Sequence, residues 1–514
     1  MSFKDRFGMS FVAMLGIILG VFMAILDNTI VNVAIPKMIS VFSTTQTHIE
    51  WVITAYLLVT GMLTPMSGYL GDRFGQKQVY LAALILFTTG SALCGLSWNA
   101  DVIIVFRIWQ AIGGAMLMPT SMTLLFSMAP PQRRGAIMGI WGIALMFAPA
   151  LGPTLSGYLV QYVDWRLIFY INVPIGIICF LLVVATIPTL PGAGKAEPPD
   201  WAGFITSLVG FFSLLYALSE APTDGWSSIT ILSFLVLAGV SLSAFVVIEL
   251  TTDHPMLDLR LLGRRVYLMA IVTTSLLNIA LLGILFLLPV FLQEGIGLTP
   301  LQTGLLTLPG ALLTGAFMPV SGLLFDRIGA RPLGIVGLGI LAATSFMFTN
   351  IGYNWTFSWI LVLYMFRSVG MGIAMMPLST AGMNDVPQHL ISRGTALQNT
   401  MRNVAGSIGT AWLSTVMQTG AAQHFVQYVQ RLSVQHLQTV RVFSSAPSVY
   451  GVTTPGALNQ LVTLLDRWAF QSGMQDAFYL TALLTVIAWV SVFFIGKKRA
   501  PVASGFPGKV AAAK

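Results

Sequence analysis

Fourteen long apolar stretches constrain the fold of this chain more than any other feature of its sequence. A helix needs about 20 largely apolar residues to cross the hydrocarbon core of a bilayer, and these stretches are long enough. We therefore predict an all-α, polytopic membrane protein with fourteen transmembrane helices. The stretches lie at about 11–35, 50–70, 79–97, 101–127, 136–160, 166–187, 201–220, 229–250, 266–292, 301–324, 332–350, 356–382, 393–418 and 475–496.

The composition agrees with this prediction and excludes several other classes of protein. Charged residues make up 9% of the 514 residues and hydrophobic residues 56%, whereas a soluble domain has about 25% charged residues. A disordered chain would be poor in large apolar residues. The two cysteines, Cys94 and Cys179, lie in apolar runs and provide neither a disulfide framework nor a zinc site. The net charge of +8 is scattered over short connections and forms no basic stripe for nucleic acid.

The sequence also lacks the pattern of an enzyme. Its five histidines are dispersed, so we predict no enzymatic activity, no cofactor and no metal site. The closest approach to a Walker-type phosphate loop, at 192–195, lacks the spacing and the Ser or Thr of that motif. Uphill transport would then depend on an ion gradient. A membrane sensor is compatible with the composition, but the internal repeat described below has no evident purpose in one.

Basic residues predict the orientation. With a cytoplasmic N-terminus, the cytoplasmic segments hold most of the 26 Lys and Arg residues, as the positive-inside rule requires. The first stretch follows Lys4 and Arg6, but its apolar core is too long for a signal peptide and no small-residue cleavage site follows it. We expect a retained first span, two cytoplasmic termini and a location in the cytoplasmic (inner) membrane.

The chain repeats itself with an offset of eight spans. The segment 68–77 is echoed by 322–331, and Phe106-Arg107 is echoed by Phe366-Arg367. Two six-helix halves with two helices between them produce this offset, and parallel six-span repeats are typical of one large transporter fold. We predict a first half at 1–187, a linker and two inserted helices at 188–265, and a second half at 266–514 that includes an outer segment at about 419–474.

Six segments of the chain carry a recognisable pattern, at 26–36, 72–77, 107–114, 148–157, 165–174 and 393–402. They resemble segments of the fourteen-span drug:proton antiporters of the major facilitator superfamily, the EmrB- and QacA-like multidrug exporters. The likeness covers about residues 11–496, and one departure from the family pattern is Ser156, which replaces a glycine. The resemblance implies the major facilitator fold with a 6 + 2 + 6 arrangement, and multidrug efflux associated with antibiotic resistance.

Asp27 is the acidic residue that lies well inside a predicted span. It lies ~12 Å from the outer end of its span, and Arg107 lies ~9 Å deep in the fourth span, at 1.5 Å per residue. Opposite charges at matched depth lower the cost of burying either one. Burial disfavours the carboxylate and a nearby guanidinium favours it, so a change in their separation would load or release a proton. The alternative is a permanent ion pair that only fixes packing.

Two further motifs suggest moving parts. Ala144, Ala148, Gly152 and Ser156 recur every four residues, so small side chains line one face of span five and allow close helix approach. Pro149 and Pro153 should bend that helix, and the resemblance extends this motif to Gly157 and assigns it to antiport. Asp72 would be unfavourable at a helix C-terminus. We expect it to face the start of the thirteenth span near Arg393, as a cytoplasmic latch. The alternative is a solvated turn whose basic residues, Arg73 and Lys77, only orient the protein. Residues assigned to this latch are Asp72, Arg73, Gly75, Asp326 and Arg327.

Arg367 and Arg402 both come near the midplane of the membrane, and the second half offers no acid at that depth. Backbone carbonyls and Asn side chains would satisfy them, or one would accept an anionic group of the substrate. Flexible Met and aromatic side chains suit an adaptable apolar cavity. We assign substrate contacts to Met23, Asn28, Asn32, Trp51, Tyr56, Trp141, Asn278, Arg367, Gln398 and Arg402.

The predicted function is a proton-coupled multidrug efflux antiporter that exports amphipathic or lipophilic compounds by alternating access. The alternative within transport is an exporter of an endogenous anionic amphiphile, such as a lipid, metabolite or antibiotic. The partners are then lipophilic substrates, protons and membrane lipid. The outer segment 419–474 contains apolar positions at near-helical spacing, which predicts one or two short surface helices. It would meet a periplasmic adaptor protein, as the resemblance implies, or be a variable loop.

Overall fold

The computed structural model describes residues 11–188, 200–435 and 454–495. This part of the chain is helical and contains no β-strand. The predicted linker at 188–199 lies almost wholly outside the described residues, as do the basic residues near both chain ends and the phosphate-loop-like segment 192–195.

Every one of the fourteen predicted stretches coincides with a helix of the described chain. A first helix group contains α2 (Phe11–Phe42), α3 (Gln46–Leu63), α4 (Met66–Phe74), α5 (Gln76–Gly95), α6 (Ala100–Met128), α7 (Arg134–Tyr162), α8 (Leu167–Tyr170) and α9 (Asn172–Thr186). An inserted pair follows, α10 (Trp201–Asp224) and α11 (Ile229–Thr251). A second group contains α12 (Arg265–Val290), α13 (Pro300–Ile328), α14 (Ala330–Phe348), α15 (Phe357–Asn384), α16 (Ile391–Gln435) and α18 (Thr454–Val492). The domain boundaries at 187 and 265 remain predictions.

Length and composition identify fewer membrane spans than the fourteen predicted. Twelve helices of the described residues are long and apolar enough to cross a membrane, and thirteen if α3 and α4 form one span bent by 58°. The bend falls at Pro65, which has no amide hydrogen to continue the helical hydrogen bonds. The predicted span at 393–418 lies in α16, which carries polar residues such as Asn399, Arg402 and Asn403. Fourteen spans therefore remains a prediction.

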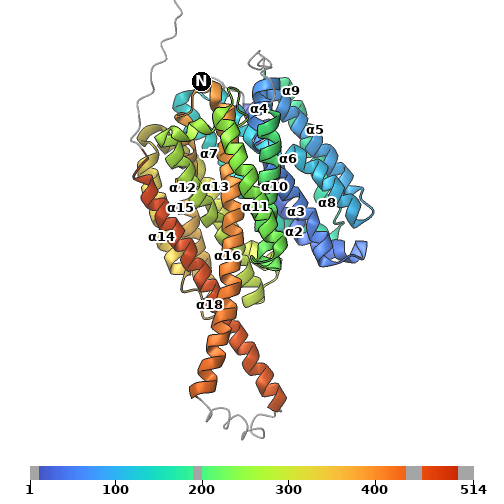
Figure 1. Cartoon of the computed structure of the whole chain (residues 1–514), viewed down its shortest axis with the longest axis vertical. Coiled ribbons are helices and arrows are strands. Elements are labelled where there is room, and N and C mark those ends of the chain that lie inside the picture. The colour runs from blue at the N-terminus through green and yellow to red at the C-terminus, as the bar shows by residue number, and fades with distance from the viewer. Residues whose placement is uncertain (1–10, 189–199, 436–453, 496–514) are drawn as a thin grey trace, which may run out of the picture.

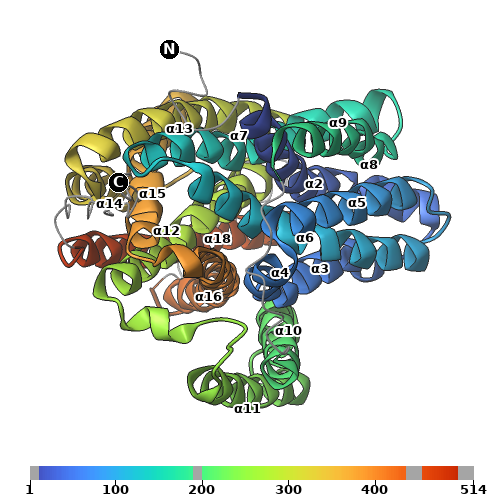
Figure 2. The ribbon, with the colours of Figure 1, turned by 90° about the horizontal axis from the view of Figure 1, so that it is seen from above.

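The two helix groups meet along two sides of the molecule. On one side α7 packs along α13, and on the opposite side α10 packs against both α3 of the first group and α16 of the second. Figure 2 shows these contacts in the view from above, with α11 outermost. The indole Nε1 of Trp226 donates to Thr415 Oγ1 (2.9 Å) in α16, and Tyr216 of α10 contacts the ring of Trp51 in α3. The inserted pair thus bridges the two groups at one of their two contact lines.

Helices α16 and α18 extend beyond the rest of the bundle at the lower end of the molecule in Figure 1. Gly420 lies close to the backbone of Gly473, and His424 Nε2 lies 2.8 Å from Asp476 Oδ2. The described parts of the outer segment, 419–435 and 454–474, are therefore continuations of α16 and α18, where we expected separate short surface helices. His436 and Arg441, in the middle of that segment, lie outside the described residues.

Candidate functional site

The Asp27 side chain is fully buried in α2 and accepts three hydrogen bonds from other helices. Its Oδ2 accepts from Arg107 Nη1 (2.5 Å) in α6, and its Oδ1 accepts from Gln110 Nε2 (3.0 Å) and Asn172 Nδ2 (2.8 Å). Both amides also donate to Ser91 Oγ in α5. A buried carboxylate requires such compensation. The network joins α2, α5, α6 and α9.

Arg107 has partners that do not depend on Asp27. Its Nε donates to the backbone carbonyl of Val52 (3.1 Å) in α3, and its Nη1 also donates to Gln110 Oε1 (2.7 Å). The guanidinium lies 4.2 Å from the centre of the Tyr56 ring, a cation–π contact that gains strength where water is excluded. The arginine would therefore keep several stabilising contacts if the carboxylate became neutral.

The contact between Asp27 and Arg107 was predicted from the sequence, and the structure has it. The side-chain amides that surround this pair were not predicted. Gln110 lies three residues after Arg107, which places both side chains on one helix face. Asn172 opens α9 within the segment 165–174, whose resemblance gave no role to this residue. Its Oδ1 is buried and has no hydrogen-bond partner. For Ser91 the sequence offers no signal.

Two carboxylates join the helix groups at the ends of equivalent helices, and we call these the latch contacts. Asp72, near the end of α4, accepts from Arg393 Nε (3.2 Å) at the start of α16. Asp326, near the end of α13, accepts from the backbone amides of Gly135 (3.0 Å) and Ala136 (3.1 Å) at the start of α7. A helix N-terminus favours a negative charge. The internal repeat thus places an aspartate at the start of a helix of the other group twice, once against an arginine side chain and once against two backbone amides.

The arginines that follow the two latch aspartates lie in the last turns of their helices. Arg73 is exposed and donates to Tyr69 Oη (2.6 Å) in its own helix, and Arg327 is exposed in the last turn of α13. Gly75 has φ +90° and Gly329 has φ +85°, a backbone region that favours glycine. Each glycine separates a latch helix from the next helix, α4 from α5 and α13 from α14.

Helix α7 has two faces of small residues. On the predicted face, a Cβ on Gly152 would lie 2.2 Å from Thr29 Oγ1, and Ser156 Oγ donates to the Ile30 carbonyl (2.6 Å), so this face packs on α2. Pro153 faces α13, where a Cβ on Gly304 would lie 3.7 Å from the Cβ of Pro153, and a Cβ on Gly157 would meet no atom within 4 Å.

The second face of α7 was not predicted. A Cβ on Gly139 would lie 2.5 Å from the Met318 carbonyl of α13, and a Cβ on Gly322 would lie 2.1 Å from the Gly135 carbonyl. The backbones of α7 and α13 therefore nearly touch near the latch contacts. Regular glycine spacing along 135–142 was the signal that would have found this face.

The structure distinguishes the two midplane arginines of the second group. Arg367 is buried and donates to Ser345 Oγ and to the carbonyl of Ala280 (2.8 Å). Arg402 is partly exposed and lies where α16 meets α6 of the first group. Its Nη2 donates to Met118 Sδ (2.8 Å) and Asn399 Oδ1 (3.3 Å). Among the described residues no carboxylate pairs with either arginine.

The other predicted substrate contacts lie in different surroundings. Tyr56 lies against Arg107, and Trp51 contacts α10. Trp141 is buried and donates to Ser121 Oγ (3.1 Å), Asn278 donates to the Arg402 carbonyl (2.9 Å), and Gln398 donates to Ser379 Oγ (2.9 Å). In α2, Met23 is buried, Asn28 is half-buried and Asn32 is exposed. The arrangement brings Asn278 and Arg402 together.

One buried acid was not identified from the sequence. Glu249, near the end of α11, is fully buried, and its Oε2 accepts from the backbone amide of Leu257 (3.0 Å). Its Oε1 has no partner. The connection between α11 and α12 folds back over this carboxyl group.

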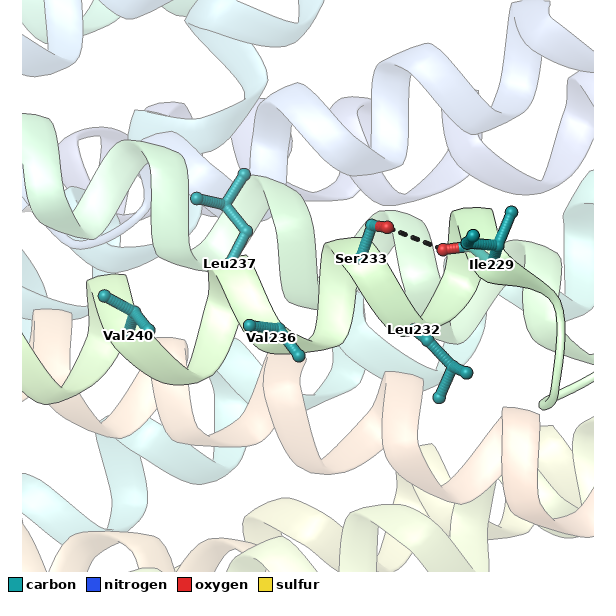
Figure 3. A pocket seen from close by; sticks show the side chains of 6 residues that line it. All are labelled: Ile229, Leu232, Ser233, Val236, Leu237 and Val240. Atoms are coloured by element: carbon teal, nitrogen blue, oxygen red, sulfur yellow. Dashed lines mark hydrogen bonds between the residues drawn. The ribbon is translucent and has the colours of Figure 1, made fainter.

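A shallow hollow lies on the exposed side of α11. It is lined by apolar side chains of one helix (Figure 3), among them Leu232, Val236 and Val240. Ser233 Oγ, the polar atom of this lining, donates to the Ile229 carbonyl of its own helix (2.7 Å). Such an exposed apolar face suits contact with lipid chains. The described residues contain no group of three or more His, Cys, Asp or Glu side chains that could hold a metal ion.

Comparisons with known proteins agree with this architecture. The family description "Major Facilitator Superfamily" matches residues 17–410. The "Uncharacterized MFS-type transporter YhcA" of Bacillus subtilis is 38% identical over 93% of this chain and 91% of its own length. The "Lincomycin resistance protein LmrB" of the same organism is 30% identical over 94% of this chain and 95% of its own length. The "Multidrug export protein EmrB" of Haemophilus influenzae is 28% identical over 92% of this chain and 94% of its own length.

Solved structures show the same fold at low sequence identity. The human organic anion transporter MFSD10 matches with a TM-score of 0.62 at 12% identity, over 94% of this chain and 99% of that one. The proton:xylose symporter XylE matches with a TM-score of 0.62 at 14% identity, over 95% of this chain and 96% of that one. These two likenesses concern the fold alone.

Proposed function

This chain belongs to the major facilitator superfamily, and on that premise we propose that it is a proton-coupled efflux antiporter of amphipathic or lipophilic compounds. It is a multi-pass membrane transporter whose relatives include proteins named for lincomycin resistance and multidrug export. The proposal adds the coupling ion, the direction and the class of substrate. It also adds a cytoplasmic-membrane location with both termini inside, for which the distribution of Lys and Arg is the support.

The observation that carries the proposal is the buried Asp27 carboxylate with its three donors. Ionisable groups inside a membrane are costly and are retained mostly for function. A proton on Asp27 would end the ion pair with Arg107. The arginine would keep its hydrogen bonds to Val52 and Gln110 and its cation–π contact with Tyr56. The cost of protonation is thereby reduced.

Asn172 offers the new proton an acceptor. Its amide now donates to Asp27 Oδ1 through Nδ2, while its Oδ1 is buried without a partner. A carboxyl group that gains a proton becomes a donor. Rotation of the amide by a half-turn would place Oδ1 toward that donor, so the same side chain serves both protonation states of Asp27.

The driving force is sufficient for export. At ~2.3 kcal/mol per charge per 100 mV, entry of one proton supports roughly a fifty-fold solute gradient. We assign the structure to a state closed at the latch end, because the latch contacts join the two groups there. Protonation of Asp27 and substrate release would occur from the opposite end. There the extensions of α16 and α18 would cap the exit or meet an adaptor protein.

The test is efflux of a fluorescent amphiphile from proteoliposomes with and without an imposed pH gradient. Asp27→Asn should abolish gradient-driven efflux while preserving protein level and binding of the amphiphile, and Asn172→Ala should reduce that efflux several-fold. Asp101→Asn is the matched control, because that carboxylate is exposed at the outer end of α6 and pairs with His48. Undiminished gradient-driven efflux by Asp27→Asn would refute the proposal.

A further inference from the structure

Arg402 differs from the other two arginines inside predicted spans in how its charge is compensated. Arg107 has a carboxylate, and Arg367 has a hydroxyl and a backbone carbonyl as acceptors. Arg402 has one amide oxygen and the Met118 thioether, and both accept from the same nitrogen, Nη2. An arginine carries five N–H donors, and a thioether is a weak acceptor. Most of the hydrogen-bonding capacity of this guanidinium is therefore unused within the described chain.

The side chain of Arg402 is partly exposed, whereas Arg107 and Arg367 are buried. The backbone of Arg402 is fixed, because its carbonyl accepts from Asn278 Nδ2 of α12. A charge near the membrane midplane is costly unless it is compensated, and no carboxylate pairs with Arg402 among the described residues.

The surroundings of Arg402 combine amides with flexible apolar side chains. Asn399 lies one turn before it in α16 and also approaches the sulfur of Met122. Asn403 Nδ2 donates to Thr64 Oγ1 (3.4 Å) at the bend between α3 and α4. Met118 and Met122 belong to α6 of the opposite group, and methionine adapts its shape to varied apolar partners. The guanidinium thus lies on the boundary between the two groups.

We propose that Arg402 binds the anionic group of an amphiphilic substrate, such as a carboxylate, sulfonate or phosphate, whose apolar body contacts the α6 methionines. Guanidinium binds these anions in a bidentate geometry that an ammonium ion cannot reproduce. The anion would replace the weak contact with Met118, so the bound substrate joins α16 to α6. This inference rests on the proposed function for its direction, but it concerns binding and is tested without transport.

Two probes with the same apolar body separate charge recognition from general apolar binding. Pyrenebutyrate is anionic and pyrenebutyltrimethylammonium is cationic. Fluorescence titration of the purified full-length protein in detergent would give an affinity for each. Arg402→Gln should weaken pyrenebutyrate binding at least ten-fold and leave binding of the cation unchanged or stronger. Arg402→Lys should show an intermediate loss for the anion, since charge remains but the bidentate geometry is lost.

The controls distinguish the possible failures. Arg260→Gln removes the same charge from an exposed connection and should change neither affinity. Asp27→Asn should keep the preference of the binding site for pyrenebutyrate. A result in which only proton coupling fails would therefore contradict the proposed function and not this inference. Equal weakening of both probes by Arg402→Gln, or weakening of neither, would overturn the inference. If Arg402→Gln does not fold, an Arg402→Lys variant that binds pyrenebutyrate as tightly as the native protein overturns it equally.

Discussion

Neutralising both latch aspartates, with Asp72→Asn and Asp326→Asn, should separate the two helix groups at the latch end. Asp326 accepts from two backbone amides at the start of α7, and a charge in such a position contributes up to ~2 kcal/mol. The ion pair of Asp72 with Arg393 keeps some exposure, 22% on the acid, so we assign it about 1 kcal/mol. The asparagines retain part of the hydrogen bonding but not the charge.

The combined loss of about 3 kcal/mol would shift the equilibrium between closed and open states on the order of a hundred-fold. A state open at the latch end with about 1% occupancy would then reach about half of the population. The single variants should shift it less, with Asp326→Asn exceeding Asp72→Asn. This order follows from the backbone amide donors and the helix dipole at Asp326 and from the partial exposure of the ion pair of Asp72 with Arg393.

The assay is the distance between spin labels on the two groups, at Gln132 and His389. Both residues are exposed and lie next to α7 and α16, where the latch contacts occur. Cys94 and Cys179 are buried and free, so they interfere little with labelling. The double variant should gain a longer distance, and Asp101→Asn should not. An unchanged distance distribution in the double variant, with normal transport, would refute the latch.

Two other predictions follow from close contacts. Gly322→Ala would place a Cβ 2.1 Å from the Gly135 carbonyl and force α13 from α7 at a cost of 1–3 kcal/mol. Proteoliposome efflux by this variant should fall about ten-fold. Gly239→Ala is the control, because its added Cβ would meet no atom within 4 Å, and it should leave efflux unchanged. Equal efflux by the two variants would contradict the prediction. Tyr56→Phe keeps the ring beneath Arg107, but Tyr56→Leu loses a desolvated cation–π contact of about 2 kcal/mol. Scanning fluorimetry should then show a lower melting temperature for the leucine variant, and identical melting of the two would exclude this role for the ring.

The helices and the repeat were predictable because both leave local signals. Apolar length identified the helices, and the duplicated segments 68–77 and 322–331 predicted that Asp72 and Asp326 have equivalent positions. The contact between Asp72 and the start of α16 was expected from the helix dipole alone, and the structure has it. The depth of Asp27 and Arg107 predicted their contact, whereas proton coupling and the gating roles remain predictions.

The sequence failed where a contact depends on helices that are distant in the chain. It did not predict the contact of Trp51 with Tyr216 of the inserted pair, and the assignment of Trp51 to substrate contacts remains a prediction. It treated Arg367 and Arg402 as equivalent, because both lie near midplane without an acid in reach. Their different partners, Ser345 and Ala280 against Met118 and Asn399, depend on how α16 is rotated relative to its neighbours.

A helix that crosses the bilayer must match its thickness, so each span appears in the sequence as a long run of apolar residues. The sequence by itself therefore determined the class of protein, and its repeated segments indicated the duplicated architecture. The surroundings of the buried carboxyl group depend on residues far apart in the chain. Arg107 is 80 positions and Asn172 145 positions from Asp27, and packing of helices from four parts of the chain brings them within hydrogen-bonding distance. Tertiary structure alone decided which partners compensate each charge inside the predicted spans.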